Sequence, residues 1–149
     1  MRLYLVQHGE ALAKEVDAER PLSPEGTADV GRLAAFLRGY AEPVHVQHSG
    51  KTRARQSAEI LAAALGGEVT AVDGIAPNDP VAAWAAGLDG LAGDRVVVGH
   101  LPFVARAVSW LLLGREESLV AYQPGSMVCL ERSEEGWTLA WMLRPELLV

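Results

Sequence analysis

Two histidines and one arginine have the residue types and positions needed to transfer a phosphoryl group. His8 directly follows one apolar run, His100 directly follows another, and Arg53 lies near the start of a predicted helix. A neutral imidazole nitrogen can attack phosphorus, while the arginine fork and the helix N-terminus hold phosphoryl oxygens. His100, when a nearby phosphate keeps it protonated, would donate to the developing charge. These residues predict a phosphoryl transfer with His8 as the nucleophile, and Gly9 would allow a ligand to approach closely.

The elements that must position these residues alternate along the chain. Short β-rich runs are predicted as strands over 3–6, 44–47, 69–72 and 95–98. Helical patterns lie between them, over 24–38, 52–65, 79–88 and 101–113, and a hairpin of 127–131 with 137–141 closes the chain. The first helix has Ser23 as its predicted N-cap and Pro24 at its first position. This alternation predicts a mainly parallel sheet with helices on both faces.

Polar clusters follow three of the predicted strands. They are Gln7-His8-Gly9, His48-Ser49 and Gly99-His100. Ligand sites in sheets of this kind lie beyond the carboxyl ends of the strands. We therefore expect the clusters and Arg53 to meet at one edge of one sheet.

Length and composition restrict the possible protein classes. A chain of 149 residues suits a single domain over 1–149, and half of its residues are hydrophobic. Its net charge of −6 argues against a nucleic-acid-binding surface, and no apolar run is long enough for a membrane span or a signal peptide. Cys129 is the only cysteine, so no internal disulfide can form. These features predict a soluble, cytoplasmic protein.

Three segments resemble the signatures of a known family. They are Leu5-Val6-Gln7-His8-Gly9-Glu10-Ala11, Ser49-Gly50-Lys51-Thr52-Arg53-Ala54-Arg55-Gln56-Ser57-Ala58 and Val98-Gly99-His100-Leu101-Pro102. In type, order and spacing they are similar to the histidine phosphatase superfamily, and chain length favours its small SixA-type phosphohistidine phosphatases. The segment Arg20-Pro21-Leu22-Ser23 fits the same pattern.

The resemblance implies a phosphoglycerate mutase-like fold, a three-layer α/β/α sandwich. It also implies that His8 is the nucleophile, that Arg53 and His100 bind phosphate, and that Arg20 lies at the pocket mouth. Gln7, Gly9 and Ser49 complete the expected phosphate surroundings. The family usually has arginine where this chain has Gln7, and a neutral amide predicts weaker phosphate binding than a guanidinium.

The general acid is less clearly marked. Larger members of the family use a carboxylate, for which Asp79 is the candidate and Glu10 the weaker one. A phosphohistidine substrate needs the acid less, because a protonated imidazole leaves more readily than an alkoxide. We therefore expect a phosphohistidine in a partner protein to be the substrate. Two alternatives stay open: a small phosphomonoester as substrate, or a weakly active or inactive phosphate- or phosphoprotein-binding module.

Other chemistries do not fit the residues. Gly50-Lys51-Thr52 lacks the earlier glycine of a phosphate-binding P-loop, because His45 occupies that position. His45 and His48 are three residues apart on a predicted strand, so they point to opposite faces and do not form a metal pair. We expect no metal and no cofactor.

Overall fold

Strands and helices alternate through most of the chain, and an antiparallel hairpin follows. The computed structural model describes residues 1–148. The elements are β1 (Arg2–Gln7), α1 (Pro24–Leu37), β2 (His45–His48), α2 (Thr52–Leu65), β3 (Glu68–Ala71), α3 (Val81–Ala86), β4 (Arg95–Gly99), α4 (Phe103–Leu113), β5 (Met127–Ser133), β6 (Gly136–Leu143) and the 3₁₀ helix η1 (Pro145–Leu147).

The six strands form one sheet in the order β3-β2-β4-β1-β5-β6. The first four strands of this order are parallel, with Val46 opposite Val96 and Leu5 opposite Val97. β5 and β6 run antiparallel at the other edge. The predicted mainly parallel sheet is confirmed, and β4 lies between β2 and β1, so the carboxyl ends of all three are neighbours.

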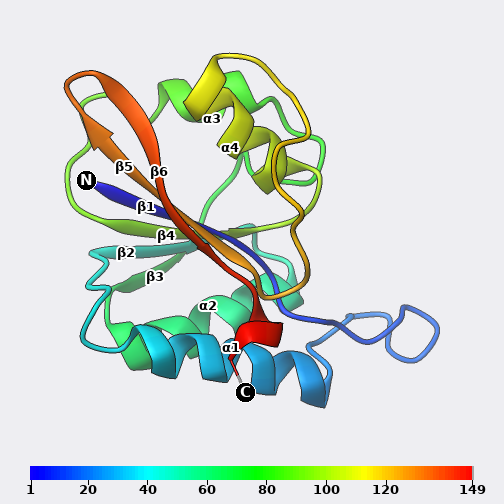
Figure 1. Ribbon diagram of the computed structural model, residues 1–149. Coiled ribbons are helices and arrows are strands. Elements are labelled where there is room, and N and C mark those ends of the chain that lie inside the picture. Colours follow the sequence, from blue (N-terminus) through cyan, green and yellow to red (C-terminus); the bar gives the residue numbers. More distant parts are fainter. Residues whose placement is uncertain (149) are drawn as a thin grey trace.

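Helices cover both faces of the sheet, which gives the predicted three-layer α/β/α sandwich (Figure 1). On one face, Val30 and Leu33 of α1 and Leu61 of α2 pack against Tyr4 and Val6. On the other face, Phe103 and Val104 of α4 pack with Leu3, Leu5 and Val97. Successive side chains of a strand point to opposite faces, so the apolar run from Leu3 to Val6 in β1 contributes to both cores.

Local sequence accounts for most helix boundaries. The Ser23 hydroxyl accepts the Gly26 N–H at 3.0 Å and Pro24 opens α1, both as predicted. α3 is shorter than the predicted 79–88, because the Asp79 carboxylate accepts the Ala76 N–H and forms a turn ahead of the helix. α4 begins at Phe103, two residues later than predicted, after the cis Leu101–Pro102 peptide.

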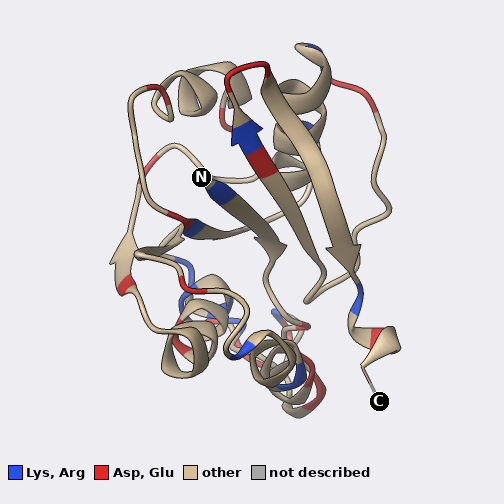
Figure 2. Cartoon of the chain, turned by 60° about the vertical axis from the view of Figure 1, so that its left-hand side comes forward, with Lys and Arg blue, Asp and Glu red and all other residues tan. Residues whose placement is uncertain are grey.

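Charged residues are confined to the periphery of the sheet. Figure 2 shows them on helices, in loops and near strand ends, while the middle of the sheet has none. Within residues 1–148, no helix is both long enough and apolar enough to span a bilayer.

Candidate active site

His8 is held by backbone contacts immediately after β1. Its N–H donates to the Gly99 carbonyl of β4 at 3.0 Å, and its own carbonyl accepts the Gly125 N–H at 3.1 Å. Its ring Nδ1 lies 2.7 Å from the Gly9 carbonyl oxygen. Because a carbonyl only accepts, Nδ1 carries the proton and Nε2 carries the lone pair. The ring is therefore held in the tautomer in which Nε2 is the nucleophilic nitrogen.

Arg53 contacts that nitrogen from the first turn of α2. Its Nε–H donates to His8 Nε2 at 3.3 Å. The N-cap residue Lys51 makes no side-chain cap, so the first-turn N–H groups of α2 stay available to an anion. The guanidinium and the helix N-terminus together provide positive charge beside Nε2.

The nucleophile is neutral at physiological pH. The pKa of His8 is lowered to about 4, mainly because the ring is buried. The hydrogen bond to Gly9 acts in the opposite direction, while the charges of Arg53 and Arg20 add to the lowering of this pKa. The unprotonated Nε2 needed for attack on phosphorus is thus the ordinary state of the free site.

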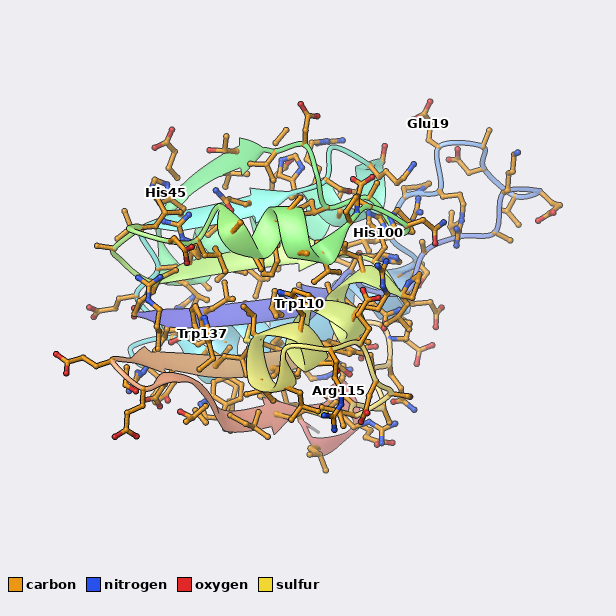
Figure 3. The ribbon with its side chains drawn as sticks, turned by 90° about the horizontal axis from the view of Figure 1, so that it is seen from above. Glu19, His45, His100, Trp110, Arg115 and Trp137 are labelled. Atoms are coloured by element: carbon orange, nitrogen blue, oxygen red, sulfur yellow. The ribbon has the colours of Figure 1, made fainter. Side chains whose placement is uncertain are left out.

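His100 lies beside His8, at the end of the neighbouring strand β4. The centroids of the two rings are 5.0 Å apart. His100 is 98% buried, and its Nε2 lies 2.6 Å from the Ser49 hydroxyl oxygen. Figure 3 shows His100 at one end of the sheet and His45 at the opposite end. The neighbouring parallel strands β1 and β4 therefore bring His8 and His100 together at their carboxyl ends, whereas His45 begins β2 and lies at the opposite end.

Arg20 reaches the same place from a long loop after β1. An isolated antiparallel bridge pairs Ala11 with Leu22 and closes the base of this loop. The Arg20 Nε–H donates to the Leu12 carbonyl at 3.1 Å, and its backbone is left-handed, with φ of +48°. A non-glycine residue in this conformation is uncommon and costs free energy, so the loop contacts must maintain it. The loop extends past the end of the sheet on the His100 side (Figure 3).

These residues enclose a pocket of about 350 Å³. Its lining is Gln7, His8, Glu10, Ala11, Arg20, Arg53, Pro77, His100, Leu101 and Pro124. Gln7 ends β1 and is 92% buried, and its Oε1 has no hydrogen-bond partner within residues 1–148. The pocket thus combines two neutral imidazoles, two guanidinium groups, one neutral amide and the Glu10 carboxylate, and its guanidinium groups suit it to a phosphoryl group.

Three larger hollows lack this combination, and one of them, of about 380 Å³, is lined by residues such as Leu22, Gln56 and Ile60. A second, of about 440 Å³, lies between α1 and β6 and is lined by apolar and aromatic side chains such as Phe36, Tyr40 and Trp141. Another, of about 510 Å³, adjoins the site at Glu10 and includes the carboxylates of Glu25 and Glu146. None of the three is lined by a histidine, so the His8 pocket is the candidate active site.

Three predicted residues have different roles in the structure. Asp79, the first candidate for the general acid, lies outside the pocket lining because its carboxylate is bound to the Ala76 N–H. Gly9 does not provide room for a ligand: a Cβ there would lie 2.8 Å from Val30 Cγ2 and 2.9 Å from the Gly26 carbonyl oxygen of α1. Ser49 contacts His100 and does not line the pocket.

Two residues have larger structural roles in the site than the sequence predicted. Glu10, the weaker candidate for the acid, is the carboxylate in the lining, and its Oε1 accepts the Ser23 hydroxyl at 2.9 Å. Ser57 was missed: its hydroxyl accepts the Gly9 N–H at 3.0 Å and donates to the Arg53 carbonyl at 2.8 Å. A serine four residues after a helical arginine, able to bond back to its carbonyl, was the available signal.

Comparison with known proteins finds similar sequences and structures. The sequence profile of the histidine phosphatase superfamily (branch 1) matches residues 3–76. The structure of the protein histidine phosphatase SixA complexed with tungstate is 26% identical, with a TM-score of 0.87 and full coverage of both chains. No protein in the curated set matches the chain significantly.

Two more distant structures share the fold. An Agrobacterium tumefaciens protein assigned as a phosphohistidine phosphatase SixA is 21% identical, with a TM-score of 0.78 and 97% of each chain covered. The phosphoserine phosphatase of Entamoeba histolytica, in complex with 3-phosphoglyceric acid, is 16% identical, with a TM-score of 0.78 and 99% of each chain covered.

Proposed function

Since the chain belongs to the histidine phosphatase superfamily, we propose that it is a metal-independent phosphatase that removes phosphate from a phosphohistidine in a partner protein. The observation that carries this proposal is the contact between the Arg53 Nε–H and His8 Nε2. It places a fixed positive charge beside the one atom that must attack phosphorus. The likeness to SixA with bound tungstate, a tetrahedral oxyanion, supports the same reading.

The first step transfers the phosphoryl group to His8. Nε2 forms a bond to phosphorus while the bond to the substrate imidazole breaks, and that imidazole leaves as a neutral ring because it was protonated beforehand. Arg53, Arg20 and His100 line the pocket around the phosphoryl oxygens. The phosphorylated His8 ring becomes cationic, and the Gly9 carbonyl that accepts its Nδ1–H stabilises this charge.

The second step hydrolyses the intermediate. Water attacks phosphorus, the bond to Nε2 breaks, and the proton released by water remains with the phosphate. His8 returns to its neutral form with the proton on Nδ1. Its low pKa, mainly an effect of burial, favours that return.

Trapping the intermediate tests the proposal. A phosphohistidine protein labelled with ³²P is mixed with the enzyme, the reaction is stopped in alkali, and the labelled peptide is sequenced. Label on His8 and loss of turnover in His8→Ala are expected. His45→Gln, at the far end of the sheet, is the matched control and should retain activity. Undiminished turnover in His8→Ala would refute the proposal.

A small phosphomonoester is the second candidate substrate, because the carboxylate of Glu10 lines the pocket. A protonated Glu10 would give its proton to an alkoxide leaving group, whereas a protonated imidazole has no such need. The fold shared with a phosphoserine phosphatase is in keeping with this option. Glu10→Gln distinguishes the candidates: a loss of about 10²-fold or more on an alkyl phosphate, exceeding the loss on phosphohistidine, would favour the ester.

A further inference from the structure

Ser49 and His100 form a pair that direct phosphate binding does not explain. Ser49 follows β2 and His100 follows the adjacent strand β4, so the sheet order brings them together. The Ser49 Oγ lies 2.6 Å from His100 Nε2, yet among residues 1–148 Ser49 is not part of the pocket lining. Its hydroxyl therefore acts on the histidine and not directly on a ligand.

Because the His100 ring is neutral, its contact with Ser49 decides which ring nitrogen carries the proton. The pKa of His100 is lowered to about 3, mainly by burial and then by the neighbouring His8 and Arg53. A neutral imidazole has one N–H donor and one lone pair. If Nε2 carried the proton, the single N–H of His100 would donate to Ser49. The ring would then have no N–H left to donate to a phosphoryl oxygen.

The surroundings of Ser49 favour the opposite arrangement. Its Oγ accepts the backbone N–H of Lys51 at 3.4 Å, and within residues 1–148 His100 Nε2 is the one acceptor that its own O–H meets. His100 Nδ1 is buried and has no partner within residues 1–148. A protonated Nδ1 would need an acceptor there, and because His100 lines the pocket, we infer that a phosphoryl oxygen is that acceptor.

We propose that Ser49 is a positioning residue whose hydroxyl donates to His100 Nε2, holds the ring proton on Nδ1 and thereby supplies an N–H donor for a phosphoryl oxygen. The identity of the ligand rests on the proposed function. The position of the proton does not, and it can be measured in the free protein.

Nitrogen chemical shifts report the tautomer directly. The full chain is labelled with ¹⁵N-histidine, and long-range ¹H–¹⁵N spectra at pH 7 are assigned for His100 by comparison with His100→Gln. We expect His100 Nδ1 to be protonated and Nε2 unprotonated in the wild type. In Ser49→Ala the proton should move toward Nε2, where it mostly resides in free histidine, whereas Ser49→Thr keeps the hydroxyl and should keep the wild-type pattern.

The following results would overturn the inference. A protonated Nε2 on His100 in the wild type contradicts it, and so does an unchanged Nδ1–H signal in Ser49→Ala. Ser133→Ala, at the exposed last residue of β5, is the matched control and should leave the His100 spectrum unchanged. Melting temperatures of all variants would show that the chains are folded.

Adding inorganic phosphate tests the second half of the inference. The His100 Nδ1–H signal should shift in the wild type. Phosphate should bind Ser49→Ala about 5- to 10-fold more weakly, which is the change in dissociation constant expected for the loss of one net hydrogen bond. A His8 signal that moves while the His100 signal stays fixed would overturn this part. A chain that shows the expected tautomer and phosphate shift but does not hydrolyse phosphohistidine would support the inference and refute only the proposed function.

Discussion

The guanidinium of Arg53 and the ring of His8 meet at one pair of atoms, with the Arg53 Nε–H donating to His8 Nε2 at 3.3 Å. Only an unprotonated Nε2 can accept this bond, so the contact requires the nucleophilic form of His8. It uses one N–H of the arginine fork and leaves the others for phosphoryl oxygens. This contact therefore marks His8 Nε2 as the nucleophilic atom and places the positive charge of the Arg53 guanidinium beside it.

Replacing Arg53 should weaken transition-state stabilisation. Arg53→Ala is expected to lower kcat/KM by about 10²- to 10³-fold, because a donor aimed at developing charge is lost. Arg55→Ala, in the same helix turn, is the matched control: Arg55 is exposed and pairs with Glu59. Its activity should stay within about twofold, since surface ion pairs contribute little. Steady-state kinetics on a phosphohistidine protein provides the measurement, and equal losses in both variants would contradict the assignment.

The titration of His8 should be displaced toward acid. Its pKa of about 4 lies below the ordinary 6.5, so Nε2 stays unprotonated as the pH falls through 6 and is lost as a nucleophile only near pH 4. An NMR titration of the free enzyme should show this midpoint. Because burial is the largest cause, His8 in Arg53→Ala should still titrate below 6.5. A midpoint near 6.5 in the wild type would show that the ring is more hydrated than the structure indicates.

Gln7 should limit the affinity of the pocket for phosphate. It lines the pocket with a neutral amide. A hydrogen bond from a charged donor is roughly twice as strong as one from a neutral donor. Gln7→Arg is therefore expected to tighten inhibition by inorganic phosphate by about tenfold, with Gln7→Met as the uncharged comparison. Unchanged inhibition in Gln7→Arg would mean that the amide already serves as well as a guanidinium. A large gain in turnover would indicate that the present site acts mainly as a binding module.

Gly26 and Gly31 of α1 should respond to alanine in opposite directions. A Cβ at Gly26 would overlap the carbonyl oxygen of Glu10 and lie 2.8 Å from its amide nitrogen, whereas nothing lies within 4 Å of one at Gly31. We expect Gly26→Ala to lower the free energy of unfolding by about 1–3 kcal/mol or more through overpacking. Gly31→Ala should raise it by about 0.5–1 kcal/mol, the helix preference for alanine. Urea denaturation measures both.

The close packing at Gly26 also links stability to the site. Glu10 follows His8 and Gly9 and lines the pocket, so displacing its backbone should disturb substrate binding. Activity of the folded Gly26→Ala fraction should fall, while that of Gly31→Ala should not. Wild-type kinetics in Gly26→Ala would show that the loop after β1 adapts without moving the pocket.

The amino-acid sequence alone determined the class of fold and pointed to three residues of the candidate site. Strand and helix periodicity is local, so the alternation along the chain was enough to predict the sheet and its two helical layers. The positions of His8, Arg53 and His100 followed because each adjoins a predicted element, and parallel strands end at a common edge. Ser23 and Pro24 began α1 as predicted, since capping depends on neighbouring residues.

Tertiary structure decided the contacts between segments far apart in the chain. Asp79 and Glu10 are both acids near strand ends, but only the folded loops put Glu10 in the pocket and bind Asp79 to a backbone amide. Likewise, Ser49 meets His100 across 51 positions of sequence, and Ser57 joins Gly9 to α2. Such hydrogen bonds depend on the packing of side chains between elements, which leaves no periodic trace in the sequence.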